Sequence, residues 1–228
     1  MKKGWTVVVV CVLFIGLLGA ADACLAQSTP SDADLQPFTV NFVYRSGGKG
    51  EVKTLTKGAD VYSGDYYKVI LTPAEDCYIY IFQIDSAQKT QRIFPMEQYR
   101  DKILNNVNPV QANRIYYIPT QNDWFRLDQQ TGVERIFLWA TRQRDEQLEQ
   151  LVERTKKADS DNVTMELMAY AEQVLASQPG TARGFDDIVE SEPFTWQEDG
   201  ESVAFSIVQQ RLEELCDGCF YLLTFMHN

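Results

Sequence analysis

Short apolar runs separated by turn residues most constrain how this chain can fold. The strongest run covers residues 77–84, where the even-numbered side chains would point to one side and Ile79 and Ile81 to the other. A run that is apolar on both faces is typical of a central strand covered on both sides. Similar runs occur at 39–44, 66–71, 90–94, 114–119, 133–140, 194–196, 203–208 and 220–226. This spacing predicts a mainly antiparallel β-sandwich.

Between the late strands the hydrophobic period changes from two to 3.6. Leu148, Leu151 and Val152 recur at helical spacing, and a second helical face follows from Val163 to Leu175. We therefore expect a helical pair inserted at about 143–178 into a single domain spanning 38–228, which makes the fold α+β overall. Three polar stretches lack a strand pattern: a loop with a short helical piece at 97–104, an acidic connection at 183–193, and residues 209–215, which fit a helix or a strand and which we interpret as a short helical turn.

Residues 1–26 have the three-part pattern of a secretory signal peptide. Lys2 and Lys3 precede an apolar stretch at 7–18 that is short for a membrane span, and small residues lead to Ala26. The pattern predicts cleavage after Ala26, a flexible lead-in at 27–37, and a periplasmic or extracellular protein with no membrane span after cleavage. An uncleaved anchor and a lipoprotein anchored through Cys24 remain as alternatives.

The charge of the chain excludes one large class of partner. Its formal net charge is −11 at neutral pH, and removal of residues 1–26 makes it more negative by one. Such a surface repels phosphate backbones and anionic lipids, so we expect no nucleic-acid partner. An acidic surface also keeps an exported protein soluble.

The scarcity of histidine and cysteine excludes much catalytic chemistry. His227 is the one histidine, so any Ser-His-Asp triad or Cys-His dyad would have to include it, and a site with two histidine ligands is excluded within one chain. Cys216 and Cys219 flank Asp-Gly, a strong turn signal, and an apolar run follows. We interpret them as a turn closed by a disulfide rather than a redox site, and we expect no catalytic residue, cofactor or metal.

The block from Tyr62 to Leu151 resembles the bacterial family known as domain of unknown function 4384 (DUF4384), with the C-terminal strand as a further candidate for the match. The matching features are segments 63–65, 77–82, 93–95, 110–112, 118–119, Phe125, 132–134 and 139–141. The resemblance implies an exported or surface-associated accessory module, a class found attached to kinase, caspase-like or repeat regions. It assigns no catalytic residue.

Aromatic and acidic residues leave two further functions open. Most of the many tyrosines and tryptophans fit a sandwich core, but Trp124 and Phe125, in a short segment between turns, are our candidates for an exposed binding surface. They would suit a glycan. Acidic pairs at 186–187, 190 with 192, and 213–214 would suit a carboxylate-pair hydrolase, although a solvated acidic surface explains them better. The Gly-rich segment 47–50 is not followed by a helix, so it is no phosphate loop.

We therefore expect an exported, non-enzymatic accessory or protein-interaction module of the cell envelope that binds an envelope protein through strand edges or aromatic loops. The alternatives are a glycan-binding protein and a hydrolase acting on envelope glycans.

Overall fold

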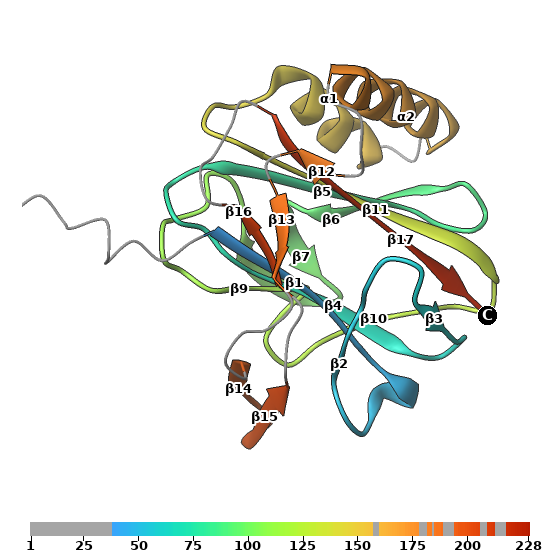
Figure 1. The fold of residues 1–228 in the computed structure, drawn as a ribbon, viewed down its shortest axis with the longest axis vertical. Coiled ribbons are helices and arrows are strands. Elements are labelled where there is room, and N and C mark those ends of the chain that lie inside the picture. The colour runs from blue at the N-terminus through green and yellow to red at the C-terminus, as the bar shows by residue number, and fades with distance from the viewer. Residues whose placement is uncertain are drawn as a thin grey trace, which may run out of the picture. The chain divides into compact units, whose positions relative to one another are not determined.

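Two β-sheets face each other in the computed structural model (Figure 1). It describes residues 38–156, 160–177, 182–183, 185–188, 194–205, 209–212 and 218–228. The first sheet has the order β10-β4-β1-β16-β13, with β2 added to β1 and β9 added to β4. Its strands are β1 (Phe38–Arg45), β2 (Lys53–Thr54), β4 (Tyr66–Thr72), β9 (Tyr116–Ile118), β10 (Phe125–Arg126), β13 (Phe185–Ile188) and β16 (Gln209–Leu212).

The second sheet has the order β12-β17-β11-β5-β6, and β3 joins β17 as its parallel neighbour. All other described pairs in both sheets are antiparallel. Its strands are β3 (Asp60–Val61), β5 (Tyr78–Ile84), β6 (Thr90–Phe94), β11 (Gly132–Thr141), β12 (Ala182–Arg183) and β17 (Cys219–His227).

Within the described residues, two hairpins, two helices and a 3-10 turn, η2 (Ser46–Gly48), lie outside the two sheets. One hairpin is formed by β7 (Met96–Tyr99) and β8 (Lys102–Asn106), the other by β14 (Phe194–Glu198) and β15 (Glu201–Phe205), and the helices are α1 (Glu146–Thr155) and α2 (Ser160–Ser177). The helices follow β11 and precede β12. The predicted fold, a mainly antiparallel β-sandwich with an inserted helical pair, is therefore confirmed.

Side-chain alternation builds the layers. In β5, Ile79 and Ile81 enter the core between the sheets, whereas Tyr80, Phe82 and Ile84 point to the opposite face, which the helices cover. The first sheet alternates in the same way, and its outer face carries the β14–β15 hairpin. The core under this hairpin, which we call the hairpin core, consists of Val43, Val52, Ile70, Trp124, Trp196 and Phe205.

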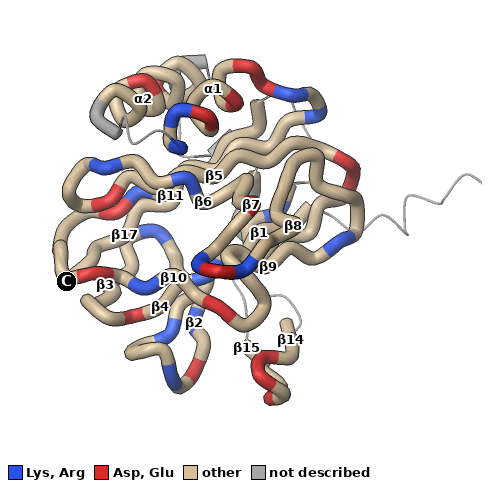
Figure 2. The backbone as a smooth tube through the Cα atoms, turned by 180° about the vertical axis from the view of Figure 1, so that it is seen from behind, with Lys and Arg blue, Asp and Glu red and all other residues tan. Residues whose placement is uncertain are grey.

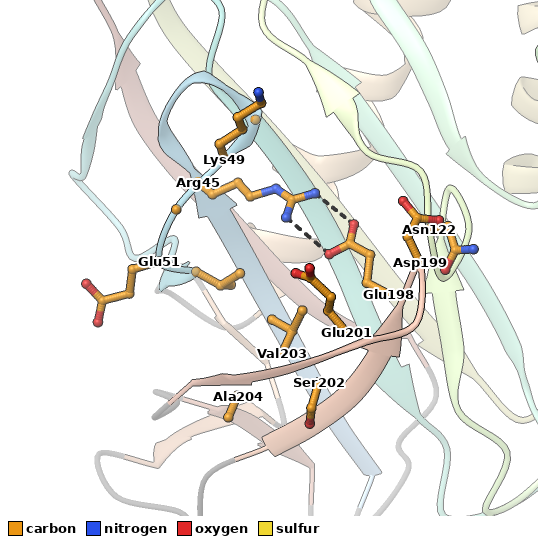
Figure 3. Close-up of a pocket in the computed structure, with 13 residues that line it drawn as sticks. Arg45, Lys49, Glu51, Asn122, Glu198, Asp199, Glu201, Ser202, Val203 and Ala204 are labelled. Atoms are coloured by element: carbon orange, nitrogen blue, oxygen red, sulfur yellow. Dashed lines mark hydrogen bonds and ion pairs between the residues drawn. The ribbon is translucent and has the colours of Figure 1, made fainter.

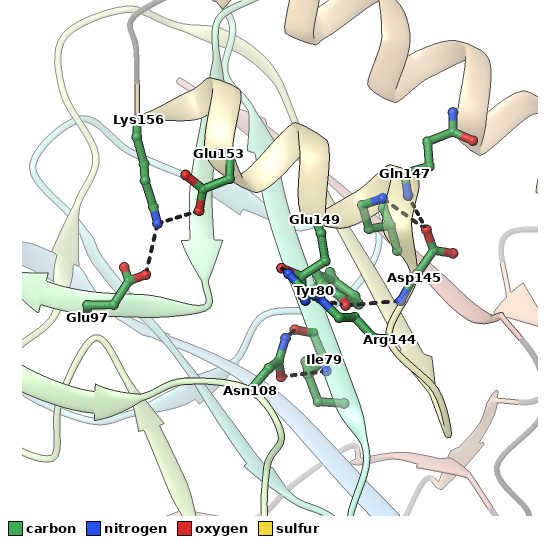
Figure 4. A network of polar contacts seen from close by, with 11 residues as sticks. Ile79, Tyr80, Glu97, Asn108, Arg144, Asp145, Gln147, Glu149, Glu153 and Lys156 are labelled. Atoms are coloured by element: carbon green, nitrogen blue, oxygen red, sulfur yellow. Dashed lines mark hydrogen bonds and ion pairs between the residues drawn. The ribbon is translucent and has the colours of Figure 1, made fainter.

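The helices attach to the second sheet through an apolar face and a polar network. Asp145 caps α1 by accepting hydrogen bonds from the backbone N–H of Gln147 and of Leu148, both at 2.9 Å. The Tyr80 hydroxyl, from β5, donates to Glu149 Oε1 at 2.8 Å (Figure 4). At the other end of α1, Lys156 Nζ lies 3.2 Å from a carboxylate oxygen of Glu97, in β7. These contacts tie α1 to two different strands.

Three expectations for polar stretches are wrong. Residues 97–104 form most of the β7–β8 hairpin, whose turn contains Arg100 at φ 52°. Residues 209–212 form β16, because pairing with β1 and β13 overrides the local helical pattern. The acidic connection begins at the last residue of β12 and contains β13. Strands β13 and β16 pair with each other and β16 also pairs with β1, so these two strands depend on partners that the local sequence does not reveal.

The signal peptide and the lead-in predicted at 1–37 lie outside the described residues. Every described element belongs to one compact unit, residues 35–228. Neither helix in the described part of the chain has both the length and the hydrophobicity needed to cross a membrane.

Candidate functional site

A cavity of about 600 Å³ opens between the hairpin strand β15 and the Gly-rich segment that follows β1 (Figure 3). We call it the groove. The first wall is segment 48–52, and the second wall, opposite it, consists of residues 201–204. Arg45, Glu198, Asp199 and Asn122 complete the lining. Its volume falls within the roughly 300–1,000 Å³ typical of ligand sites, but its lining is mainly polar.

Glycines shape the first wall. Gly47, Gly48 and Gly50 have φ of 60°, 74° and 86°, in the left-handed region that glycine adopts without steric cost. Gly48 also approaches the Tyr66 ring so closely that a Cβ atom there would lie 2.8 Å from it. The buried carboxylate of Asp65 accepts from the backbone N–H of Gly47 at 3.0 Å. This segment is therefore held in one conformation beside the first sheet.

The second wall is a hairpin with a two-residue turn. Asp199 and Gly200 have φ of 49° and 86°, the signature of a type I′ turn. Residues flanking such a turn form a hydrogen-bonded pair, and pairs then alternate along the hairpin. From the register Glu198↔Glu201, the outward-pointing backbone groups of β15 belong to Ser202 and Ala204. Within the described residues, β15 pairs with β14 alone.

A partly buried ion pair joins the hairpin to the first sheet. Arg45 donates from both terminal nitrogens to Glu198, at 2.7 Å and 3.1 Å, and Trp124 Nε1 donates to Glu198 Oε1. The Arg45 guanidinium also lies 4.2 Å from the centroid of the Trp124 ring. A bidentate pair of this kind fixes orientation as well as charge. It places the base of the hairpin relative to β1.

Lys68 is enclosed beside this pair. Its Nζ donates to the backbone carbonyl of Gln121 at 2.6 Å and lies 4.4 Å from the Trp124 ring centroid and 5.5 Å from that of Trp196. Burial lowers the Lys68 pKa to about 7, against the opposing effect of the Glu198 carboxylate. Since the side chain is fully buried, this amine supports the hairpin core and does not face the groove.

The expected exposed surface at Trp124 and Phe125 is wrong. Trp124 is only 3% exposed, because it lies in the hairpin core and its indole N–H is used by Glu198. Phe125 is half-buried and packs against Tyr67, with ring centroids 5.1 Å apart. The sequence alone did not reveal that residues 194–205 fold over Trp124.

The structure also brings His227 together with a serine and a carboxylate. His227 Nε2 lies 3.1 Å from Ser63 Oγ, and Nδ1 lies 3.5 Å from Glu134 Oε1. The arrangement Ser63–His227–Glu134 resembles a catalytic triad, but the 3.5 Å between His227 Nδ1 and Glu134 Oε1 is too long for a good hydrogen bond. Glu134 also already accepts hydrogen bonds from Gln83 and from the backbone N–H of Ser86. His227 is 1% exposed. We interpret the group as a network that fixes the end of β17 against the turn at Ser63.

The cysteines fit structural roles. Cys219 is disulfide-bonded, and Cys216, its expected partner, lies outside the described residues. Burial raises the pKa of the free thiol of Cys77 to about 12, with Glu75 and Asp76 adding to the effect, so this thiol resists ionisation. Within the described residues, no group of three or more His, Cys, Asp or Glu side chains is placed to hold a metal ion.

The side chains of the carboxylate pairs noted in the sequence lie outside the described part of the structure. Glu190, Glu192, Glu213 and Glu214 lie outside the described residues, and of the pair 186–187 only the backbone, in β13, is described. Glu198 and Glu201 do face each other across the hairpin. However, both oxygens of Glu198 accept hydrogen bonds from Arg45 or Trp124, so this carboxylate serves to attach the hairpin to the first sheet.

Fold and site together define a β-sandwich with a polar groove flanked by a free strand edge. Within it, residues 60–144, from β3 to just beyond β11, match the family model of DUF4384, a domain of unknown function, which confirms the resemblance drawn from the sequence. No curated protein and no solved structure gives a significant match. Most of the groove lies outside the matched stretch, so the family match does not account for it.

The groove was missed at the sequence level, although its turns were visible. Segment 47–50 and the pair Asp199-Gly200 are strong turn signals. Nothing in their local sequence indicates that the two turns, about 150 residues apart, lie on the same face of one sheet.

Proposed function

We propose that this chain is an exported, non-enzymatic accessory protein of the bacterial cell envelope that binds another protein at the groove. The observation that carries the proposal is the free edge of β15 beside an open polar cavity. An exposed strand edge is a template for pairing with another chain, and many recognition domains use it in this way.

The alternatives receive less support from the described residues. A glycan-binding face built by stacking needs a row of exposed rings, whereas Tyr62 is the one aromatic side chain in the described part that is mainly exposed. A carboxylate-pair hydrolase needs two carboxylates with oxygens available to substrate, and Glu198 does not meet this requirement.

The test is site-specific crosslinking in living cells. A photoreactive amino acid replaces Ser202, which is exposed beside the groove, in the full chain expressed in a related bacterium. The matched control carries it at Gln91, an exposed position on β6. We expect one or two envelope proteins to be captured reproducibly from position 202 and not from position 91.

The opposite results would overturn the proposal. Capture of no protein from position 202, or of the same proteins from both positions, would show that the groove is not a protein-binding site. Glycan fragments in place of protein would favour the glycan-binding alternative.

A further inference from the structure

The charged side chains around the groove are unequally paired. Arg45 and Glu198 neutralise each other. Lys49, Glu51, Asp199 and Glu201 are exposed, and none of them forms an ion pair within the described residues, which leaves three carboxylates against one ammonium. Figure 2 shows acidic positions gathered at the turn of the β14–β15 hairpin. Charge complementarity therefore favours a basic occupant.

The free edge limits how such an occupant can bind. Ser202 and Ala204 point their backbone N–H and C=O groups away from β14, so they can form up to four backbone hydrogen bonds with an added strand. A strand advances about 3.3 Å per residue, so these two positions pair with a segment of about four residues. That segment would lie between β15 and segment 48–52, within the cavity.

Side chains alternate between the two faces of β15, and this indicates which side chains of an added strand would face the hairpin core. Val203 packs on the hairpin core, and Glu201 lies on the same face of β15, near the Arg45–Glu198 pair (Figure 3). Residues of an added strand opposite these two positions face the same side. A small apolar side chain suits the position opposite Val203, and a basic one suits the position opposite Glu201.

We propose that the groove binds an extended basic peptide segment of a partner protein by strand addition to β15, with a lysine or arginine two residues from a small apolar residue. The inference rests on the proposed function, since it names the chemistry of the partner at that site.

Fluorescence anisotropy with designed peptides tests the proposal on the chain purified from the bacterium that exports it. The probe is a labelled hexapeptide in which threonine occupies every second position. The other three positions carry lysine, valine and lysine, so these side chains share one face of the added strand. One control replaces lysine by glutamate, and a second keeps the lysines but carries proline at alternate positions, which blocks pairing as a strand. We expect the glutamate control to bind about four- to 25-fold more weakly, because reversing an exposed charge pair costs about two- to fivefold and reversal acts at two positions. We expect the proline control to bind about tenfold more weakly, because it loses backbone hydrogen bonds to β15.

A matched pair of variants separates strand addition from general attraction to an acidic protein. Ala204→Pro removes an outward-pointing N–H without removing a hairpin hydrogen bond, whereas Ala204→Ser keeps it. We expect about tenfold weaker binding for A204P and a change within about twofold for A204S. Peptides methylated on alternate backbone nitrogens give the same test on the unaltered protein, in case A204P does not fold.

Equal binding of the lysine and proline-containing peptides would overturn strand addition, and equal binding of the lysine and glutamate peptides would overturn the charge preference. If crosslinking from position 202 still captures a protein in either case, the proposed function stands and only the stated chemistry of the partner is wrong. If no peptide binds and no protein is captured, both proposals fail.

Discussion

Lys68 occupies a position that is unfavourable for its charge. The side chain is fully buried against Trp124 and Trp196, and burial lowers its pKa to about 7. Below that pH the amine is protonated in both the folded and the unfolded chain. Between about pH 7 and the ordinary lysine value near 10.4, the unfolded chain keeps the proton and the folded chain does not. Folding is therefore favoured progressively as the pH rises through this window.

We expect the free energy of unfolding, measured in urea, to rise by about 2 kcal/mol between pH 6.5 and pH 9 relative to the Lys68→Met variant. The comparison with the variant cancels the contributions of other titrating groups. Equal pH dependence in the two proteins would show that Lys68 keeps its proton in the folded state, with the neighbouring Glu198 outweighing burial.

Ser63 tests the non-enzymatic proposal at the same scale. Its hydroxyl lies 3.1 Å from His227, but the orientation of that imidazole by Glu134 is weak at 3.5 Å. We expect a serine-directed fluorophosphonate probe to leave Ser63 unmodified, and Ser63→Ala to lower the free energy of unfolding by about 1 kcal/mol through loss of the hydrogen bond. Mass spectrometry of the probe-treated protein is the measurement. Modification at Ser63 would contradict the proposal and indicate an acyl-transfer site.

At the scale of elements, Trp196 is a central contact between the β14–β15 hairpin and the first sheet. Trp196 is 4% exposed and contacts the rings of Trp124, Tyr117, Phe194 and Phe205. We expect Trp196→Ala to lower the free energy of unfolding by about 3–5 kcal/mol, the usual cost of removing a large buried ring.

The matched control for that prediction is Thr195→Ala, at the neighbouring exposed position of the same strand, which should change stability by less than about 0.5 kcal/mol. Urea unfolding followed by tryptophan fluorescence and by circular dichroism measures both variants. A cost below about 1 kcal/mol for Trp196→Ala would mean that the hairpin contributes little to the fold, and that the groove has one loose wall.

The elements that could be predicted from the sequence are those whose pattern is complete within one segment. Strand β5 has apolar residues on both faces, and α1 has leucines at helical spacing after its N-cap, Asp145. Strands β7 and β8 are polar strands that pair with each other across a short turn, whereas β16 is polar locally and forms because of distant partners. The groove depends on such partners most of all, since Arg45 and Glu198 are 153 positions apart, and the sequence could not indicate that Glu198 would be buried.

Considered as a whole molecule, the two outer faces of the sandwich are covered differently. The helical pair covers the second sheet through an extensive apolar core. The first sheet is covered by a short hairpin whose free edge remains beside an open cavity. The groove lies at this more thinly covered face. None of the residues that line it belongs to the core between the two sheets, so binding at the groove would leave that core intact.

Export is the remaining proposal about the whole chain, and the disulfide at Cys219 is consistent with it, since disulfides persist mainly in oxidising compartments. We expect the chain purified from the periplasm or the medium of a related bacterium to begin at Gln27, as measured by intact mass and N-terminal sequencing. Ala26→Arg should accumulate the uncleaved form, because a large charged side chain does not fit a cleavage site made for small residues. Cys24→Ser should leave the protein in the same cell fraction as the parent chain. Radiolabelled palmitate on the parent chain, lost in Cys24→Ser, would instead establish a lipoprotein, and an intact N-terminus in the cytoplasmic fraction would contradict export.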